Sequence, residues 1–188
     1  MIHRLVCLAV IAVLSACAVA SPPVEPVPLA PATRLRLPAP AALGHAVEAV
    51  QMVTASHDGD SFTFEGRVSV KDGVLLLVTT DGLGRRATSL RWDGRELSLE
   101  KASWLPLSLP PPANMLADLM LIYWPLPALR SGLDGATLDQ DGGARRLRQD
   151  GVNLVDVNRQ GDGWTGSAQL VNHVWHYSLD IVSQQVSP

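Results

Sequence analysis

Asp-Gly pairs punctuate the sequence at intervals that suit a series of hairpins. The dipeptide occurs eight times, beginning at residues 58, 72, 81, 93, 134, 141, 150 and 162. Tight hairpin turns need positive φ angles, which Asp-Gly adopts at little cost. Successive pairs are seven to fourteen residues apart, except between 93 and 134. This spacing predicts an up-and-down antiparallel sheet that is interrupted once by a different structure.

Between these turns, apolar and polar residues alternate, as expected for strands with one buried face. We expect about ten strands, near residues 46–56, 60–71, 74–80, 86–92, 95–101, 136–140, 144–149, 152–159, 164–171 and 174–184. The run from Val74 to Val78 is apolar throughout, which predicts a central strand covered on both faces. Arg145, Arg146 and Arg148 are expected to belong to a solvated face.

The interruption contains the apolar stretch ANMLADLMLIYWPLPALRSGL, residues 113–133. Its apolar residues follow a helical period, Pro125 ends the first helix, and Pro127 suits the first turn of a second helix. The first helix is too short to span a bilayer. A sheet with one apolar face must be covered, so we predict an α+β fold: a strongly curved antiparallel sheet, an unclosed β-barrel of roughly ten strands, with a two-helix lid on its concave face.

The N-terminus has the features of a secretion signal. A basic start is followed by an apolar run and by Leu14-Ser15-Ala16-Cys17, which resembles a bacterial lipobox. In that interpretation residues 1–17 are the signal peptide and lipobox, and Cys17 becomes the acylated N-terminus. The alternative is an ordinary signal peptide cut near Ala20. Either way the mature chain has no cysteine pair, which excludes disulfides and thiolate metal sites.

A proline-rich segment follows the lipobox. Residues 18–40 are predicted to form a semi-rigid tether, because such a composition favours extended polyproline conformations. Residues 41–188 are then the folded domain. Once Arg4 is removed with the signal, 14 basic residues face 18 acidic ones, so no basic surface indicates a nucleic-acid partner.

Several segments resemble lipoprotein-localisation proteins. The stretch LLLVTTDGLGRRATSLRWDGRELSLEKASWLP is similar to the part of LolB-like proteins that precedes their helical lid, and the stretch at 113–133 is similar to the lid. The order and spacing agree across residues 45–133. LPAPAALGHAVEAVQMVT followed by SFTFEGRVSV looks like the opening of an uncharacterised LolB-like lipoprotein family that is often encoded near aryl polyene or fatty-acid-like synthesis genes.

The resemblance implies a function and a location in the cell. LolB-like receptors take triacylated lipoproteins from a periplasmic LolA-like carrier, hold the acyl chains in an apolar cavity and release them into the outer membrane. Their exposed membrane-delivery leucine matches Leu83, although a lone exposed leucine at a turn is also common. Ala18 stands where an aspartate would retain a lipoprotein in the inner membrane. An outer-membrane lipoprotein facing the periplasm is therefore implied.

Alternation and helical period together select residues that could contact acyl chains. These cavity candidates are Phe62, Phe64, Val68, Val70, Leu90, Trp92, Met115, Leu116, Leu119 and Met120. The alternative is that they pack together as a solid core, in which case the protein is a membrane-tethered scaffold without a ligand.

Enzyme and metal motifs are not found in the sequence. It contains no nucleophile elbow, Walker loop, zinc-protease motif or dinucleotide fingerprint. His173 and His176 are expected on a strand, where their odd separation would point them to opposite faces and away from a shared metal. We therefore predict a binding protein that is not an enzyme and has no cofactor.

Overall fold

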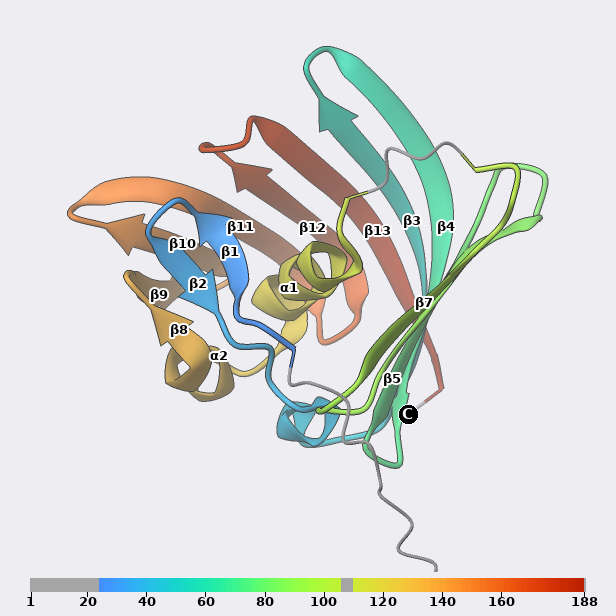
Figure 1. Cartoon of the computed structure of the whole chain (residues 1–188), viewed down its shortest axis with the longest axis horizontal. Helices are drawn as coiled ribbons and strands as arrows, with labels where there is room; N and C mark the ends of the chain where they lie inside the picture. The colour runs from blue at the N-terminus through green and yellow to red at the C-terminus, as the bar shows by residue number, and fades with distance from the viewer. Residues whose placement is uncertain (1–23, 106–109, 188) are drawn as a thin grey trace, which may run out of the picture.

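Ten antiparallel strands form one strongly curved sheet that wraps around a helix (Figure 1). The computed structural model describes residues 24–105 and 110–187, so the predicted signal peptide and Cys17 lie outside the described residues. The strand order is β7-β6-β5-β4-β3-β13-β12-β11-β10-β9. The strands are β3 (Val47–His57), β4 (Asp60–Lys71), β5 (Val74–Thr80), β6 (Arg86–Trp92), β7 (Leu97–Lys101), β9 (Thr137–Asp141), β10 (Ala144–Gln149), β11 (Val152–Asp162), β12 (Thr165–Asn172) and β13 (Tyr177–Ser187).

The sheet consists of two meanders joined at their centre. β3 to β7 form the first and β9 to β13 the second, and the ladder between β3 and β13 joins them. The edge strands β7 and β9 are not paired with each other in the described residues, so the barrel is unclosed. The predicted fold class and all ten predicted strands are confirmed. Asp58 and Asp72 adopt φ angles of 51° and 52°, as the predicted tight turns require.

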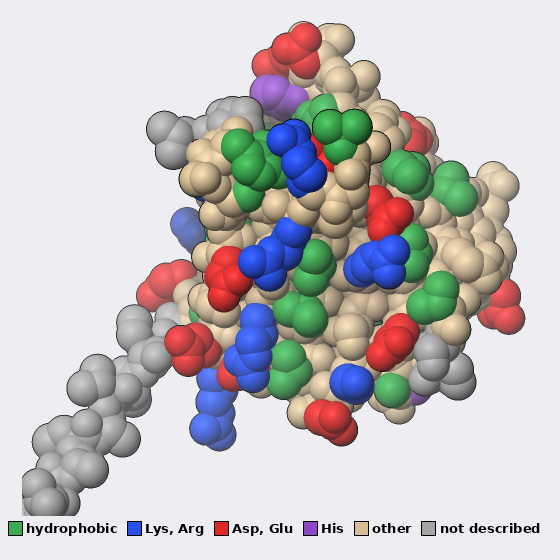
Figure 2. All heavy atoms as spheres, turned by 90° about the vertical axis from the view of Figure 1, so that its right-hand side faces the viewer, with side chains coloured by type: hydrophobic (Ala, Val, Ile, Leu, Met, Phe, Trp, Pro, Cys, Tyr) green, Lys and Arg blue, Asp and Glu red, His purple; other side chains and the backbone are tan. Residues whose placement is uncertain are grey.

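The convex face of the sheet is open to solvent on the first meander. Leu75 and Leu77 of β5 point inward and are buried, whereas the outward Leu76 remains 37% exposed. Figure 2 shows this side of the molecule, where hydrophobic side chains stand among charged ones. The prediction that residues 74–78 are covered on both faces is therefore wrong. β5 is central in its meander, but only its concave face has a covering layer.

Two helices occupy the predicted position between the meanders. α1 (Pro112–Tyr123) lies in the concavity of the sheet, and α2 (Leu126–Gly132) packs against β9. The break falls at Trp124 and Pro125, as the prolines predict. Apolar residues occur nearly all round α1, which is typical of a buried helix.

A small second sheet contradicts part of the predicted tether. β1 (Val27–Ala30) and β2 (Thr33–Leu35) pair with each other and with β8 (Leu133–Asp134), and a 3₁₀ helix follows at Pro40–Leu43. Leu29 and Leu35 are 2% and 0% exposed. Alternating apolar residues therefore override the proline-rich composition, and β1 tolerates proline because it is an edge strand that can lack a backbone donor. The tether prediction is wrong from Val27 onward, and residues 18–23 lie outside the described part.

The segment after β2 closes one end of the curved sheet. The indole Nε1 of Trp92 donates a hydrogen bond of 2.9 Å to the Pro38 carbonyl oxygen, and that of Trp124 lies 3.5 Å from the Ala39 carbonyl oxygen. Gly132 lies against this segment, because a Cβ there would stand 2.4 Å from the Arg36 carbonyl oxygen. Residues 36–39 therefore belong to the folded domain and pack against this end of the sheet.

The structural role of the N-terminal strands can be tested by truncating Leu35. We expect Leu35→Ala to lower the free energy of unfolding by about 2–5 kcal/mol, because it leaves a cavity in a fully buried site. Arg34→Ala is the matched control, since Arg34 points to solvent. Urea denaturation of both variants measures the difference. Equal, small effects would show that this segment is a tether after all.

Candidate functional site

A cavity of about 700 Å³ lies between α1 and the concave face of the sheet. Its walls come from β3, β4, β5, β6 and β13, from one face of α1, from residues just before α1 and from the turn before β13. The wall is mostly apolar, and its volume falls within the range of roughly 300–1,000 Å³ that is typical of ligand sites. The principal apolar lining residues are Val53, Phe62, Phe64, Leu77, Met115, Leu119, Ile122, Trp175, Leu179 and Ile181.

One face of α1 forms the inner wall of this cavity. Met115, Asp118, Leu119 and Ile122 line it, and their spacing of three and four residues places them on one side of the helix. The opposite wall is hollow partly because Gly66 occupies an inward position on β4. A Cβ at Gly66 would meet only ordinary van der Waals contacts, the nearest at 3.6 Å, so this position has room for a side chain.

The structure divides the ten predicted cavity residues into two groups. Four line the cavity: Phe62, Phe64, Met115 and Leu119. Six are instead buried in the solid core, at most 3% exposed: Val68, Val70, Leu90, Trp92, Leu116 and Met120. On β4 and β6 the division follows position along the strands, because their ends near the 3₁₀ helix are filled. On α1 it follows the helix face, because Met115 and Leu119 face the cavity and Leu116 and Met120 do not.

Exposed apolar side chains gather at the hollow end of the sheet. Phe62 is 56% exposed, Leu83 81% and Trp104 44%. Thr80 at the end of β5 pairs with Glu65 in the middle of β4, so the turn after β5 leaves the sheet in the direction of the start of β4. The end of β7 is level with the start of β6. The register therefore places Leu83 and Trp104 toward the same end of the sheet as Phe62. The cavity and these residues therefore share one end of the molecule, opposite the end closed by residues 36–39.

Leu83 stands on a hydrogen-bonded turn between β5 and β6. The Asp81 carboxylate accepts hydrogen bonds from the backbone N–H of Leu83 at 3.0 Å and of Arg85 at 2.9 Å. The hydrogen bond from the Arg85 backbone N–H is the main cause of the lowered pKa of Asp81. This carboxyl group therefore stays ionised and accepts hydrogen bonds. The Arg85 guanidinium also lies 4.4 Å from the centre of the Trp104 ring. The turn thus presents Leu83 to solvent beside an arginine and an indole.

One acidic side chain lies inside the apolar cavity. Asp118 of α1 faces Tyr177 of β13, whose hydroxyl donates to the two carboxylate oxygens at 2.8 and 3.0 Å. Burial raises the pKa of Asp118 to about 7, against a smaller lowering effect of the Tyr177 hydrogen bond. Burial also raises the pKa of Tyr177, which keeps this hydroxyl protonated as a donor.

Sequence reasoning missed Asp118, because it selected only apolar residues as cavity candidates. The available signal was a single acidic residue within a helix that is otherwise almost entirely apolar. Two other polar pairs near the cavity form hydrogen bonds between strands of the sheet. The Thr79 and Thr88 hydroxyls lie 2.7 Å apart, and Gln51 Nε2 donates to Ser183 Oγ at 3.3 Å.

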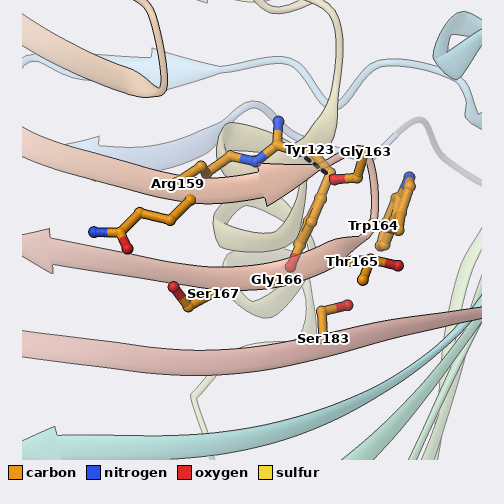
Figure 3. A pocket seen from close by; sticks show the side chains of 9 residues that line it. Tyr123, Arg159, Gly163, Trp164, Thr165, Gly166, Ser167 and Ser183 are labelled. Carbon is orange, nitrogen blue, oxygen red and sulfur yellow. Dashed lines mark hydrogen bonds between the residues drawn. The ribbon is translucent and has the colours of Figure 1, made fainter.

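Aromatic stacking holds the C-terminal end of α1 against the β11–β12 hairpin (Figure 3). The rings of Tyr123 and Trp164 are 3.9 Å apart and nearly parallel, and the Arg159 guanidinium lies 5.1 Å from the Tyr123 ring centre. Arg159 also donates to the Gly163 carbonyl oxygen. The small pocket here measures about 10 Å³, room for about one water, so this cluster is an anchor for the helix.

Arg145 has a different position from the one that its sequence neighbours suggested. It points inward, is 5% exposed, and donates from Nη1 to the Leu121 carbonyl oxygen at 2.7 Å and from Nε to Gln140. The prediction of a solvated face is wrong for this arginine, because strand alternation separates it from Arg146 and Arg148. Arg145 satisfies a carbonyl in the last turn of α1, where a cation is favourable.

His173 and His176 lie in the turn between β12 and β13, so the strand position expected for them is wrong. The His173 imidazole is 2.8 Å from the Asp156 carboxylate. No group of side chains with the makeup of a metal site was found among residues 24–105 and 110–187. Nor does any helix in that part of the chain combine the length and apolarity needed to cross a membrane.

Comparisons with known proteins give a family and a distant structural likeness. The family model described as "Protein of unknown function (DUF3261)" matches residues 48–185. No curated protein matches the chain. Among solved structures, a LolA superfamily protein from Nitrosomonas europaea is similar at a TM-score of 0.44 and 9% sequence identity, covering 79% of this chain and 92% of its own.

The raised pKa of Asp118 predicts a pH-dependent stability. The folded protein holds this proton more tightly than the unfolded chain, whose aspartates titrate near pH 3.9. The stabilisation of the folded state by this proton is therefore complete below about pH 4, and it is lost as the pH rises through about 7. We expect the unfolding free energy to fall between pH 5 and 8 by about 2 kcal/mol more in the unchanged protein than in Asp118→Asn.

Urea denaturation across this pH range measures the effect. Asp180→Asn is the matched control, because Asp180 is an exposed aspartate on the same strand as Tyr177. It should keep the pH dependence of the unchanged protein. Parallel pH profiles for Asp118→Asn and the unchanged protein would contradict the assignment.

Proposed function

This chain belongs to the family described as Protein of unknown function (DUF3261), and we propose that it is an outer-membrane lipoprotein that binds acyl chains and assists their transfer into the membrane. In this proposal Cys17 carries the lipid anchor and the domain faces the periplasm. The ligand is a lipoprotein or a lipid, and a LolA-like periplasmic carrier is a further partner. The observation that carries the proposal is the apolar cavity of about 700 Å³ under α1.

The chemistry of the cavity supports acyl chains as ligands. Each buried CH₂ group contributes about 0.8 kcal/mol, so an apolar space of this volume can hold a chain without any strong polar contact. Met115 on α1 adds an adaptable apolar surface beside the rigid sheet. For transfer to proceed, the cavity must hold a chain more tightly than the donor and less tightly than the bilayer.

The exposed residues at the hollow end support a role in delivery. Leu83 can enter the apolar part of a bilayer, and Trp104 suits the interface between headgroups and acyl chains. Arg85 and Arg86 beside them can contact anionic headgroups. Because the cavity lies at the same end, a chain that leaves it would have a short path into the membrane. The competing scaffold function needs a filled interior, which the cavity argues against.

Filling the cavity should reduce acyl-chain binding. Gly66→Leu adds an inward side chain at a position with room for it, so the protein should fold while the longest chains lose space. We expect affinity for a long-chain fluorescent fatty acid to fall at least about tenfold, equivalent to two or more excluded CH₂ groups. Ser69→Leu, which points outward on the same strand, is the control and should bind normally.

Titration of fluorescent fatty acids of increasing chain length measures this effect. The loss should grow with chain length for Gly66→Leu alone. If both variants bind every chain as the unchanged protein does, the ligand does not occupy this cavity.

A charge at Leu83 should slow delivery without weakening binding. Leu83→Glu places a carboxylate where the proposal needs an apolar contact, and we expect transfer of a bound fluorescent fatty acid to vesicles to slow by roughly tenfold. Val182→Glu is the control, because Val182 is 66% exposed on the convex face of β13. Stopped-flow transfer to phosphatidylglycerol vesicles gives the rates. Unchanged transfer by Leu83→Glu would remove this leucine from the mechanism.

A further inference from the structure

Asp118 and Tyr177 place a hydrogen-bonding site in the wall of an otherwise apolar cavity. We propose that this pair binds the head group of the ligand, and that the head group is an uncharged hydrogen-bond donor, an amide N–H or a hydroxyl, attached to the acyl chain. The same site disfavours a free fatty-acid carboxylate. The inference rests on the proposed function, because it specifies which acyl compounds the cavity accepts.

The carboxylate of Asp118 has capacity for a further donor. A carboxylate offers about four acceptor positions, whereas the hydroxyl of Tyr177 carries a single hydrogen that both 2.8 Å and 3.0 Å contacts must share. In the part of the chain that the structure describes, no other hydrogen bond to Asp118 is found. The carboxylate also lies on the face of α1 that lines the cavity, between Met115 and Ile122. A ligand in the cavity can therefore reach it.

The described residues that line the cavity include no Lys or Arg. His57, at the end of β3, is the one side chain among them that could carry a positive charge. The His57 side chain is 62% exposed, and its Nδ1 lies 3.5 Å from Oδ2 of Asp58. A fatty-acid carboxylate at Asp118 would lose its hydration without gaining a cation, and it would face a second carboxylate.

A head group that donates a hydrogen bond would stabilise the ionised carboxylate of Asp118. Burial disfavours the charged form of Asp118, which is why its pKa lies near 7. An incoming N–H or O–H stabilises the ionised carboxylate and replaces the water that the apolar chain displaces. An ester offers only acceptors and supplies no such contact. The site thus distinguishes acyl compounds that have equal chain length and differ only in the head group.

The amide and the hydroxyl have different biological sources. An amide N–H is present where an acyl chain is attached to the amino group of a lipoprotein, and a hydroxyl is present in many free lipids. Both supply the same donor to Asp118. Separate probes for each donor therefore test the shared chemistry and also distinguish the sources.

Competition among four compounds that share a sixteen-carbon chain tests the proposal. Palmitamide, cetyl alcohol, palmitate and methyl palmitate are titrated at pH 8 against Nile red bound to the full chain carrying Cys17→Ser, which prevents acylation. We expect palmitamide, cetyl alcohol or both to displace Nile red at concentrations about tenfold lower than palmitate and methyl palmitate, the effect of one hydrogen bond to a charged group. Whichever donor is preferred identifies the source.

Substitutions at the site give the decisive comparison. Asp118→Asn keeps the shape of the side chain and should remove most of the tenfold discrimination against palmitate, and Asp118→Leu should remove all of it. Asp180→Asn should keep the discrimination, because Asp180 lies outside the cavity on β13. Nile red binding by each variant shows that its cavity is intact.

Two results would overturn the proposal in distinguishable ways. If the unchanged protein binds all four compounds equally, or binds palmitate best, the head-group assignment is wrong while acyl-chain binding stands. The same holds if Asp118→Leu keeps the full discrimination. If the unchanged protein binds neither Nile red nor any of the four compounds, the proposed function itself fails.

Discussion

The burial of α1 against the concave face of the sheet is the contact on which the rest of the structure depends. A ten-stranded sheet with one apolar face cannot leave that face in water, and α1 supplies the cover. Leu116 and Met120 of α1, and Trp124 directly after it, are completely buried. The anchor at Tyr123 and the Arg145 bond to the helix carbonyl hold the C-terminal end of α1. The helix fills only part of the concavity, so its other face borders a cavity.

The relative position of the cavity and the exposed apolar residues supports the proposed function better than either feature alone. An apolar cavity alone is compatible with many ligands, and a single exposed leucine is common on soluble proteins. Here the N-terminal segment closes one end of the sheet, while the cavity, Leu83 and Trp104 share the other end. A route between an apolar interior and an apolar surface follows from that arrangement. Asp118 and Tyr177 then add a polar contact by which chains with different head groups can be distinguished.

Local patterns in the sequence were sufficient for the ten strands of the main sheet, the turns between them and the two helices. Asp-Gly turns and alternation depend on neighbouring residues, so they could be recognised without knowing the fold. The errors concern contacts between distant segments. Leu29 and Leu35 are buried in a core to which α1, about eighty residues later, also contributes. Arg145 is inward because α1 presents the Leu121 carbonyl to it. No local pattern contains that information.

What the sequence by itself determined is which side chains point inward, since alternation along a strand is a property of the extended backbone. Phe62, Phe64, Val68 and Val70 all share the inward face of β4, as predicted. Only the tertiary structure decided that the first pair borders a cavity and the second pair lies in a solid core. The physical reason is packing: the N-terminal segment and the 3₁₀ helix fill the space above one half of the strand, and α1 leaves the other half open.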